Sequence, residues 1–126
     1  MEIFKNKKIL ITGHTGFKGS WLSIWLTHLG AKVVGVSNNI VGSPSNFLVS
    51  EISKVVDDYR FDIRDEGAIK SLIERVQPDF VFHLAAQALV RPSYENPLET
   101  MSINAIGSAN VLDALRGLDK KVVAVM

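Results

Sequence analysis

The sequence predicts an α/β fold built on a doubly wound parallel sheet with strand order 3-2-1-4-5. Short apolar runs rich in β-branched residues alternate with segments whose apolar residues recur at helical spacing. The first run leads directly into a turn that carries a glycine at every third position. Because helix-linked parallel strands cross over with one hand, this alternation favours a sheet that is wound in both directions from its first strand.

The first half of the chain carries three predicted strands. Residues 8–12 and 32–36 are short β-branched apolar runs, and residues 54–61 form a weaker one. Residues 18–29, between the first two strands, carry apolar side chains at helical spacing. Residues 37–50 are rich in Ser, Asn, Gly and Pro, which predicts a loop with one helical turn.

The second half continues the alternation with two helices and two strands. An N-capping aspartate predicts a helix over residues 65–76, and residues 79–84 are apolar on both faces, as in a central parallel strand. Residues 85–96 predict a loop. A proline suited to a first turn starts a long helix over residues 97–115, and residues 121–126 predict strand five.

Composition excludes several classes of function. A length of 126 residues allows one domain, and the net charge of +1, with Lys and Arg scattered, favours no nucleic-acid or membrane surface. No cysteine is present, so neither disulfides nor thiolate metal sites are expected, and three isolated histidines predict no metal site. With no secretory segment and no apolar stretch long enough to span a bilayer, we expect a cytoplasmic protein.

The chain ends inside its fifth predicted strand. We therefore expect residues 1–126 to be a partial nucleotide-binding domain, truncated after strand five and with no second domain, taken from the N-terminal part of a longer enzyme. The alternative is a complete small domain of five strands. An uncovered apolar strand is a template for pairing with another chain, so we expect a homo-oligomer.

The glycine-rich turn is the strongest functional signal. Gly13, Gly16 and Gly19 stand between a strand and a helix, in the spacing G-x-x-G-x-x-G and not the usual G-x-G-x-x-G. Glycine permits a tight turn and a close approach of the backbone to a diphosphate, which the helix N-terminus would attract. The alternative is a strand-to-helix turn that binds no ligand.

Four segments resemble the extended short-chain dehydrogenase/reductase superfamily. They are ITGHTGFKGSWL (11–22), FDIRD (61–65), VFHLAAQALVRPSYENPLET (81–100) and NAIGSANVLDAL (104–115). Within the NAD-dependent sugar-nucleotide epimerases and dehydratases, HTGFKGSW and HLAAQ-x-LVR-x-SY are most similar to the CDP-glucose 4,6-dehydratase family. The resemblance implies a Rossmann domain with NAD as cofactor and CDP-glucose, or a related sugar nucleotide, as substrate of the parent enzyme.

The resemblance also implies which residues bind the cofactor. The three glycines would cradle the diphosphate, Asp62 and Ile63 would meet the adenine, and Asn104 would support the active-site backbone. Along the ribose and nicotinamide half would lie Leu84, Ala85, Ala86 and Gln87. In the glycine turn itself, His14 would crowd the loop or bind a phosphate, Phe17 would sit in the same turn, and Lys18 could pair with a phosphate as a point charge. The alternatives are a turn or capping role for Asp62 and a solvated Lys18.

Two departures from the family pattern affect function. The acidic residue expected about 20 positions after the glycines is absent, since no Asp or Glu occurs between residues 14 and 49. Ser37, Asn38 and Asn39 stand there instead and could bind a ribose without charge. The catalytic Tyr-x-x-x-Lys is also absent, because Tyr59 and Tyr94 are the only tyrosines and neither has a lysine four residues later.

We therefore expect the cofactor-binding half of a sugar-nucleotide 4,6-dehydratase, a lyase with internal redox chemistry, with no catalytic residue among these 126 and no turnover by this chain. The first alternative is another NAD-dependent sugar-nucleotide epimerase or dehydratase. The second is a stand-alone nucleotide-binding module without catalysis. The residues themselves do not distinguish NAD from NADP.

Overall fold

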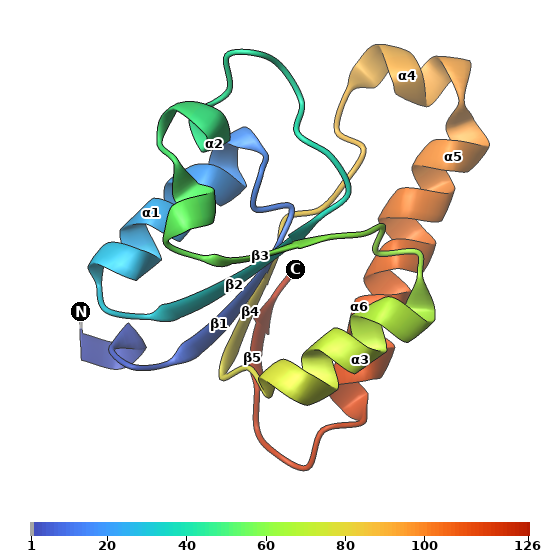
Figure 1. The fold of residues 1–126 in the computed structure, drawn as a ribbon. Helices are drawn as coiled ribbons and strands as arrows, with labels where there is room; N and C mark the ends of the chain where they lie inside the picture. Colours follow the sequence, from blue (N-terminus) through green and yellow to red (C-terminus); the bar gives the residue numbers. More distant parts are fainter. Residues whose placement is uncertain (1) are drawn as a thin grey trace.

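The computed structural model describes residues 2–126 and contains a five-stranded parallel sheet with the order β3-β2-β1-β4-β5 (Figure 1). This is the predicted fold class and strand order. The strands are β1 (Lys8–Thr12), β2 (Lys32–Ser37), β3 (Asp57–Arg60), β4 (Phe80–His83) and β5 (Val123–Val125).

Helices connect these strands in chain order. They are a 3-10 turn η1 (Glu2–Phe4), α1 (Phe17–His28), α2 (Asn46–Val49), a 3-10 turn η2 (Ile52–Lys54), α3 (Glu66–Val76), α4 (Val90–Glu95), α5 (Pro97–Met101), a π-helical segment η3 (Ser102–Ile106) and α6 (Gly107–Arg116). Among residues 2–126, none of these helices has the length and apolar character needed to cross a membrane.

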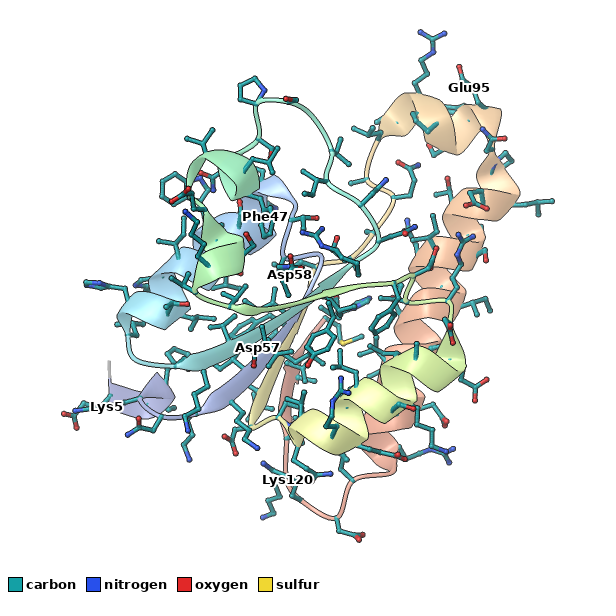
Figure 2. All side chains as sticks on the ribbon, in the orientation of Figure 1. Lys5, Phe47, Asp57, Asp58, Glu95 and Lys120 are labelled. Atoms are coloured by element: carbon teal, nitrogen blue, oxygen red, sulfur yellow. The ribbon has the colours of Figure 1, made fainter. Side chains whose placement is uncertain are left out.

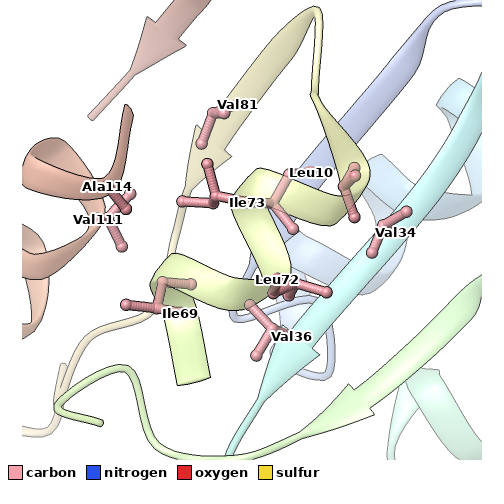
Figure 3. Close-up of a cluster of buried hydrophobic side chains, with 10 residues drawn as sticks. Leu10, Val34, Val36, Ile69, Leu72, Ile73, Val81, Val111 and Ala114 are labelled. Carbon is pink, nitrogen blue, oxygen red and sulfur yellow. The ribbon is translucent and has the colours of Figure 1, made fainter. Parts of the chain in front are cut away.

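The sheet is covered on both faces, with α1 and α2 on one side and α3 and α6 on the other (Figure 1). Side chains of a strand alternate between the faces, so Leu10 packs under α3 while its neighbours Ile9 and Ile11 pack under α1. The cluster under α3 and α6 appears in Figure 3. It contains Leu10, Val34, Val36, Ile69, Leu72, Ile73, Val76, Val81, Val111 and Ala114.

Capping and chain breaking set the ends of α3 as predicted. The Asp65 side chain accepts a hydrogen bond from the backbone N–H of Ala68 at 3.0 Å, which satisfies one of the free donors of the first turn. At the other end, Gln77 takes a left-handed conformation and Pro78 follows it, so the helix stops at Val76.

The predicted loop over residues 85–96 is wrong in its second half, because α4 occupies Val90–Glu95. Pro92 stands in the first turn, where a missing N–H costs no hydrogen bond. The Arg91 and Glu95 side chains add an ion pair at 2.8 Å, and Ser93 Oγ donates to the carbonyl of Val90 at 2.6 Å. Local pairs of this kind stabilise a helix that is too short to show apolar periodicity.

Two strands and one helix also differ from the prediction. Strand β3 begins at Asp57, because Ile52 turns into the core at the start of η2. Strand β5 covers only Val123–Val125 of the predicted 121–126. The predicted long helix is continuous from Pro97 to Arg116 but contains the π-helical segment η3.

Strand β5 pairs with β4 on one side and forms an edge of the sheet on the other. Its side chains are exposed, at 55% for Val123 and 48% for Val125. Such an edge offers unpaired N–H and C=O groups beside apolar side chains, which favours pairing with a second copy.

We therefore expect the chain to self-associate in a concentration-dependent way and Val123→Lys to shift it toward monomer, since a charge on the edge opposes strand pairing. Light scattering over a concentration series measures this. Val55→Lys is the matched control, because Val55 is 59% exposed but lies outside the strands. A wild-type chain that stays monomeric at high concentration would contradict the edge-strand prediction.

Candidate functional site

A cavity of about 860 Å³ lies at the carboxyl ends of β1, β2 and β4. The strand order reverses between β2 and β4 around β1, and open α/β sheets bind ligands at this point. The lining residues come from the glycine turn, the β2 end, the β3–α3 loop, the β4–α4 segment and α5 with η3. They are Gly13, Thr15, Gly16, Phe17, Ser37, Asn38, Asn39, Val41, Pro44, Ser45, Asn46, Asp62, Ile63, Arg64, Leu84, Ala85, Ala86, Gln87, Ala88, Leu89, Pro92, Glu99 and Ile103.

Most of the sequence-predicted site residues line this cavity. Four do not, namely His14, Lys18, Gly19 and Asn104. No cluster of three metal-ligating side chains occurs among residues 2–126.

The three glycines of the turn have different structural roles. Gly13 has φ +75°, and a Cβ there would lie 2.7 Å from backbone atoms of Leu84 and Ala85. A Cβ on Gly19 would collide with the carbonyl oxygen of Gly13. Among residues 2–126, a Cβ at Gly16 has one close neighbour, the Gly13 carbonyl oxygen at 3.3 Å, and the backbone is extended at φ −70° and ψ 169°. Gly13 and Gly19 are therefore required by packing, whereas the space at Gly16 opens into the cavity.

The N-terminus of α1 lies at this turn and carries no side-chain cap. Gly16 is the N-cap residue, and no acidic residue occurs in the first turn. The partial positive charge of the helix end is therefore available to an anion in the cavity. Phe17 is 75% exposed and lines the cavity, while Lys18 is exposed but does not line it.

His14 is fully buried beneath the turn and faces away from the cavity. Its Nε2 hydrogen-bonds Oδ1 of Asp58 at 2.8 Å, and its ring meets that of Phe47 edge to face at 5.3 Å. Asp58 and Phe47 are both labelled in Figure 2. A Cβ on Gly35 would overlap the His14 ring, so this imidazole occupies the space that a side chain on β2 would need. Burial lowers the pKa of His14 despite the neighbouring carboxylate.

A polar network closes the β2 end of the cavity. The Thr15 hydroxyl donates to the carbonyl oxygen of Asn39 at 2.7 Å and lies 2.7 Å from the Ser37 hydroxyl. Asn38 Nδ2 donates to Asp62 Oδ2 at 3.3 Å. The tip of β2 is therefore neutral, but the structure brings the Asp62 carboxylate to it from the neighbouring loop.

Asp62 forms an ion pair with Arg64 at 2.7 Å, which holds the pKa of the carboxyl below its usual range. Arg64 also contacts Glu99 of α5 at 3.0 Å and therefore joins the β3–α3 loop to α5. Both partners raise the pKa of the Arg64 guanidinium further. Sequence reasoning missed both Arg64 and Glu99 as site residues, although Arg64 lies inside the FDIRD motif and Glu99 inside the segment 81–100 that resembles the family.

The β4–α4 segment is held from two directions. The backbone N–H of Ala85 donates to Thr12 Oγ1 at 3.2 Å. Asn104, in the π-helical segment, accepts from the N–H of Gln87 at 2.8 Å and donates to its carbonyl at 3.1 Å. A helical asparagine thus satisfies both backbone groups of one residue, and the segment is positioned without a regular strand.

The chain is similar to proteins that are named as sugar-nucleotide dehydratases and epimerases. The family described as GDP-mannose 4,6 dehydratase matches residues 10–125. The chain is 42% identical to a CDP-glucose 4,6-dehydratase of Salmonella typhimurium over 115 residues, covering 91% of this chain and 32% of that protein. It is 33% identical to a GDP-mannose 4,6-dehydratase of Yersinia enterocolitica, covering 91% and 33%.

Solved structures show the same fold. The UDP-glucose 4-epimerase of Thermus thermophilus in complex with NAD superposes with a TM-score of 0.76 at 33% identity, covering 86% of this chain and 33% of that one. The NAD complex of the Brucella ovis UDP-glucose 4-epimerase gives 0.75 at 29% identity, covering 87% and 32%. The chain spans about a third of the length of the curated relatives that it matches.

Burial of His14 predicts a pH-dependent stability. Its folded-state pKa lies below the ordinary value of 6.5, so the folded state resists protonation and the chain loses stability as pH falls below that value. We expect the melting temperature to fall from about pH 7.5 to pH 5, and the fall to be smaller in His14→Gln.

His28→Gln is the control, since His28 is exposed on α1 and should leave the profile unchanged. His83, whose pKa burial also lowers, retains part of the dependence in both variants. Identical pH profiles for His14→Gln and the wild-type chain would contradict this assignment.

Proposed function

The chain belongs to the GDP-mannose 4,6-dehydratase family, and we propose that it is the NAD-binding part of a sugar-nucleotide 4,6-dehydratase. The observation that carries the proposal is Gly16. It faces a cavity at the switch point of the sheet, at the uncapped N-terminus of α1, while packing of the chain itself explains the other two glycines. A Cβ at Gly16 would lie 3.3 Å from the Gly13 carbonyl oxygen, a looser contact than at the other two glycines, and a diphosphate that approaches the backbone there would explain the glycine.

Two groups of residues that line the cavity are assigned, within this proposal, to the two halves of a dinucleotide. Asp62 and Ile63 form one group, where a carboxylate can accept from an exocyclic amine and an aliphatic side chain can pack on a ring. The backbone from Leu84 to Gln87 forms the other, where the small side chains of Ala85 and Ala86 allow close approach. Bound NAD would accept a hydride from the sugar and return it, and these residues would hold it in place.

The β2 tip supports NAD over NADP within this proposal. Ser37 and Asn38 can hydrogen-bond ribose hydroxyls, and residues 37–39 include no Lys or Arg that would hold a 2′-phosphate. Contact of Lys18 with a phosphate stays a prediction, since its side chain does not line the cavity. Asn104 would act indirectly, through the backbone of Gln87.

The finer part of the proposal is the substrate, CDP-glucose, with loss of water from the sugar as the parent reaction. The 42% identity to a CDP-glucose 4,6-dehydratase supports it over the GDP-mannose and UDP-glucose relatives. Assembly with a second copy and a cytoplasmic location are further parts of the proposal. The alternatives are an epimerase of this kind and a binding module without catalysis.

Gly16→Val should reduce NAD affinity by at least about tenfold with little loss of fold, because a branched side chain would fill the diphosphate space. Calorimetry measures the affinity and circular dichroism the fold. Gly13→Ala serves as the comparison, since its Cβ meets the backbone of Leu84 and Ala85 and its φ is positive. The Gly13→Ala variant should lose thermal stability. Equal NAD affinity in Gly16→Val and the wild-type chain would exclude the glycine turn as the NAD site.

The chain with NAD and CDP-glucose should release no 4-keto-6-deoxy sugar. The Tyr-x-x-x-Lys pair that the family resemblance leads one to expect is absent from its 126 residues. Loss of a catalytic unit removes several orders of magnitude of rate. Product above the level of a protein-free blank, detected by chromatography, would show that other residues carry the chemistry.

A further inference from the structure

The Asp62 carboxylate lies in the cavity wall with every acceptor position already used. Its Oδ1 accepts from the backbone N–H of Arg64 at 2.9 Å and from Arg64 Nε at 3.0 Å. Its Oδ2 accepts from Arg64 Nη2 at 2.7 Å and from Asn38 Nδ2 at 3.3 Å. A carboxylate offers about four lone-pair positions, so a ligand that donates to Asp62 must replace one of these four donors.

Asn38 is the donor that a ligand can replace. Its hydrogen bond is the longest of the four, and its side chain is exposed at the rim of the cavity. The other three donors belong to Arg64, which is two residues away and grips both oxygens at once. When a ligand N–H replaces the Asn38 amide, one N–H donor to Asp62 Oδ2 takes the place of another. The ion pair between Asp62 and Arg64 stays intact.

Arg64 is itself held in place by three further contacts. Its Nη1 pairs with Glu99 of α5 at 3.0 Å. Asn110 of α6 donates to the carbonyl oxygens of Ile63 and Arg64 at 3.1 Å each, which fixes the loop backbone. The forked contact prevents rotation of the carboxylate, because both of its oxygens face one planar guanidinium.

We propose that Arg64 is a positioning residue for the base of the dinucleotide: it locks Asp62 so that only the place of the Asn38 amide is open, and there the exocyclic amine of a base can donate. This inference rests on the proposed function. Adenine presents such an amine. Hypoxanthine carries a carbonyl oxygen where adenine carries the amine, and this oxygen would face the carboxylate of Asp62, which is also an acceptor. The nearest donor of hypoxanthine is its ring N–H, and the carboxylate would have to rotate to accept from it.

The test compares the affinities for NAD and for its deaminated analogue, nicotinamide hypoxanthine dinucleotide. The wild-type chain should bind NAD about tenfold or more tightly than the analogue, because the analogue leaves the carboxylate unmatched. In Arg64→Gln the Asp62 carboxylate is free to rotate toward the ring N–H. The ratio of the affinity for NAD to the affinity for the analogue should therefore approach one. Arg91→Gln is the matched control, since the Arg91 side chain is 89% exposed, pairs with Glu95 and does not line the cavity.

The Arg64→Lys variant tests whether Asp62 needs the forked geometry of the guanidinium or only its positive charge. It keeps the positive charge but cannot grip both oxygens, so its ratio should fall between those of the wild type and Arg64→Gln. Circular dichroism checks the fold of each variant. Loss of folded structure in both Arg64 variants would make the residue structural and overturn the inference.

The results of these binding experiments test this inference and the proposed function separately. A wild-type chain that binds neither dinucleotide contradicts the proposed function and the inference with it. A wild-type chain that binds NAD but does not prefer it to the analogue overturns the inference alone. So does an unchanged ratio in a folded Arg64→Gln or Arg64→Lys variant.

Discussion

The close approach of the glycine turn to the end of β4 is the constraint on which the site depends. At Gly13 the backbone passes so near to Leu84 and Ala85 that any side chain would displace one of the two segments. The positive φ of Gly13 sends the chain back over β1, where Gly19 packs on its carbonyl. This turn brings the N-terminus of α1 and the segment after β4 to the two sides of one cavity.

A buried polar contact holds the same turn from below. His14 would be expected to reach toward a phosphate in a glycine loop, but its ring lies above Gly35 and its Nε2 binds Asp58 of β3. Burying an imidazole costs free energy that hydrogen bonds offset, and here Nε2 has a partner while the buried Nδ1 has none among residues 2–126. The partner here also ties β3 to the turn, so one contact connects the cavity floor with the edge of the sheet.

Two further polar contacts join residues of the cavity wall to the helical stretch from Pro97 to Arg116. Arg64 reaches Glu99 of α5, and Asn104 binds both backbone groups of Gln87. Asn104 lies in the π-helical segment, where the helix departs from its regular repeat. Such segments often occur at functional sites, and in this chain the segment carries the side chain that holds the cavity backbone.

The fold and the approximate position of the site were predictable from the sequence because local signals encode them. The β-branched runs, the apolar periodicity, the Asp65 cap and the glycine spacing act within a few residues along the chain. The helix α4 was not predictable in this way, because it is short and is stabilised by the Arg91–Glu95 pair, not by an apolar face.

The tertiary structure alone decided how the polar side chains are used. His14 pairs with Asp58, 44 residues away along the chain, and the second partner of Arg64, Glu99, lies 35 residues away, so no local pattern joins them. Local sequence determines the backbone path because each residue's conformational preferences and its neighbours act at short range. Whether a polar side chain faces the cavity or the core depends on which distant segment the fold brings beside it.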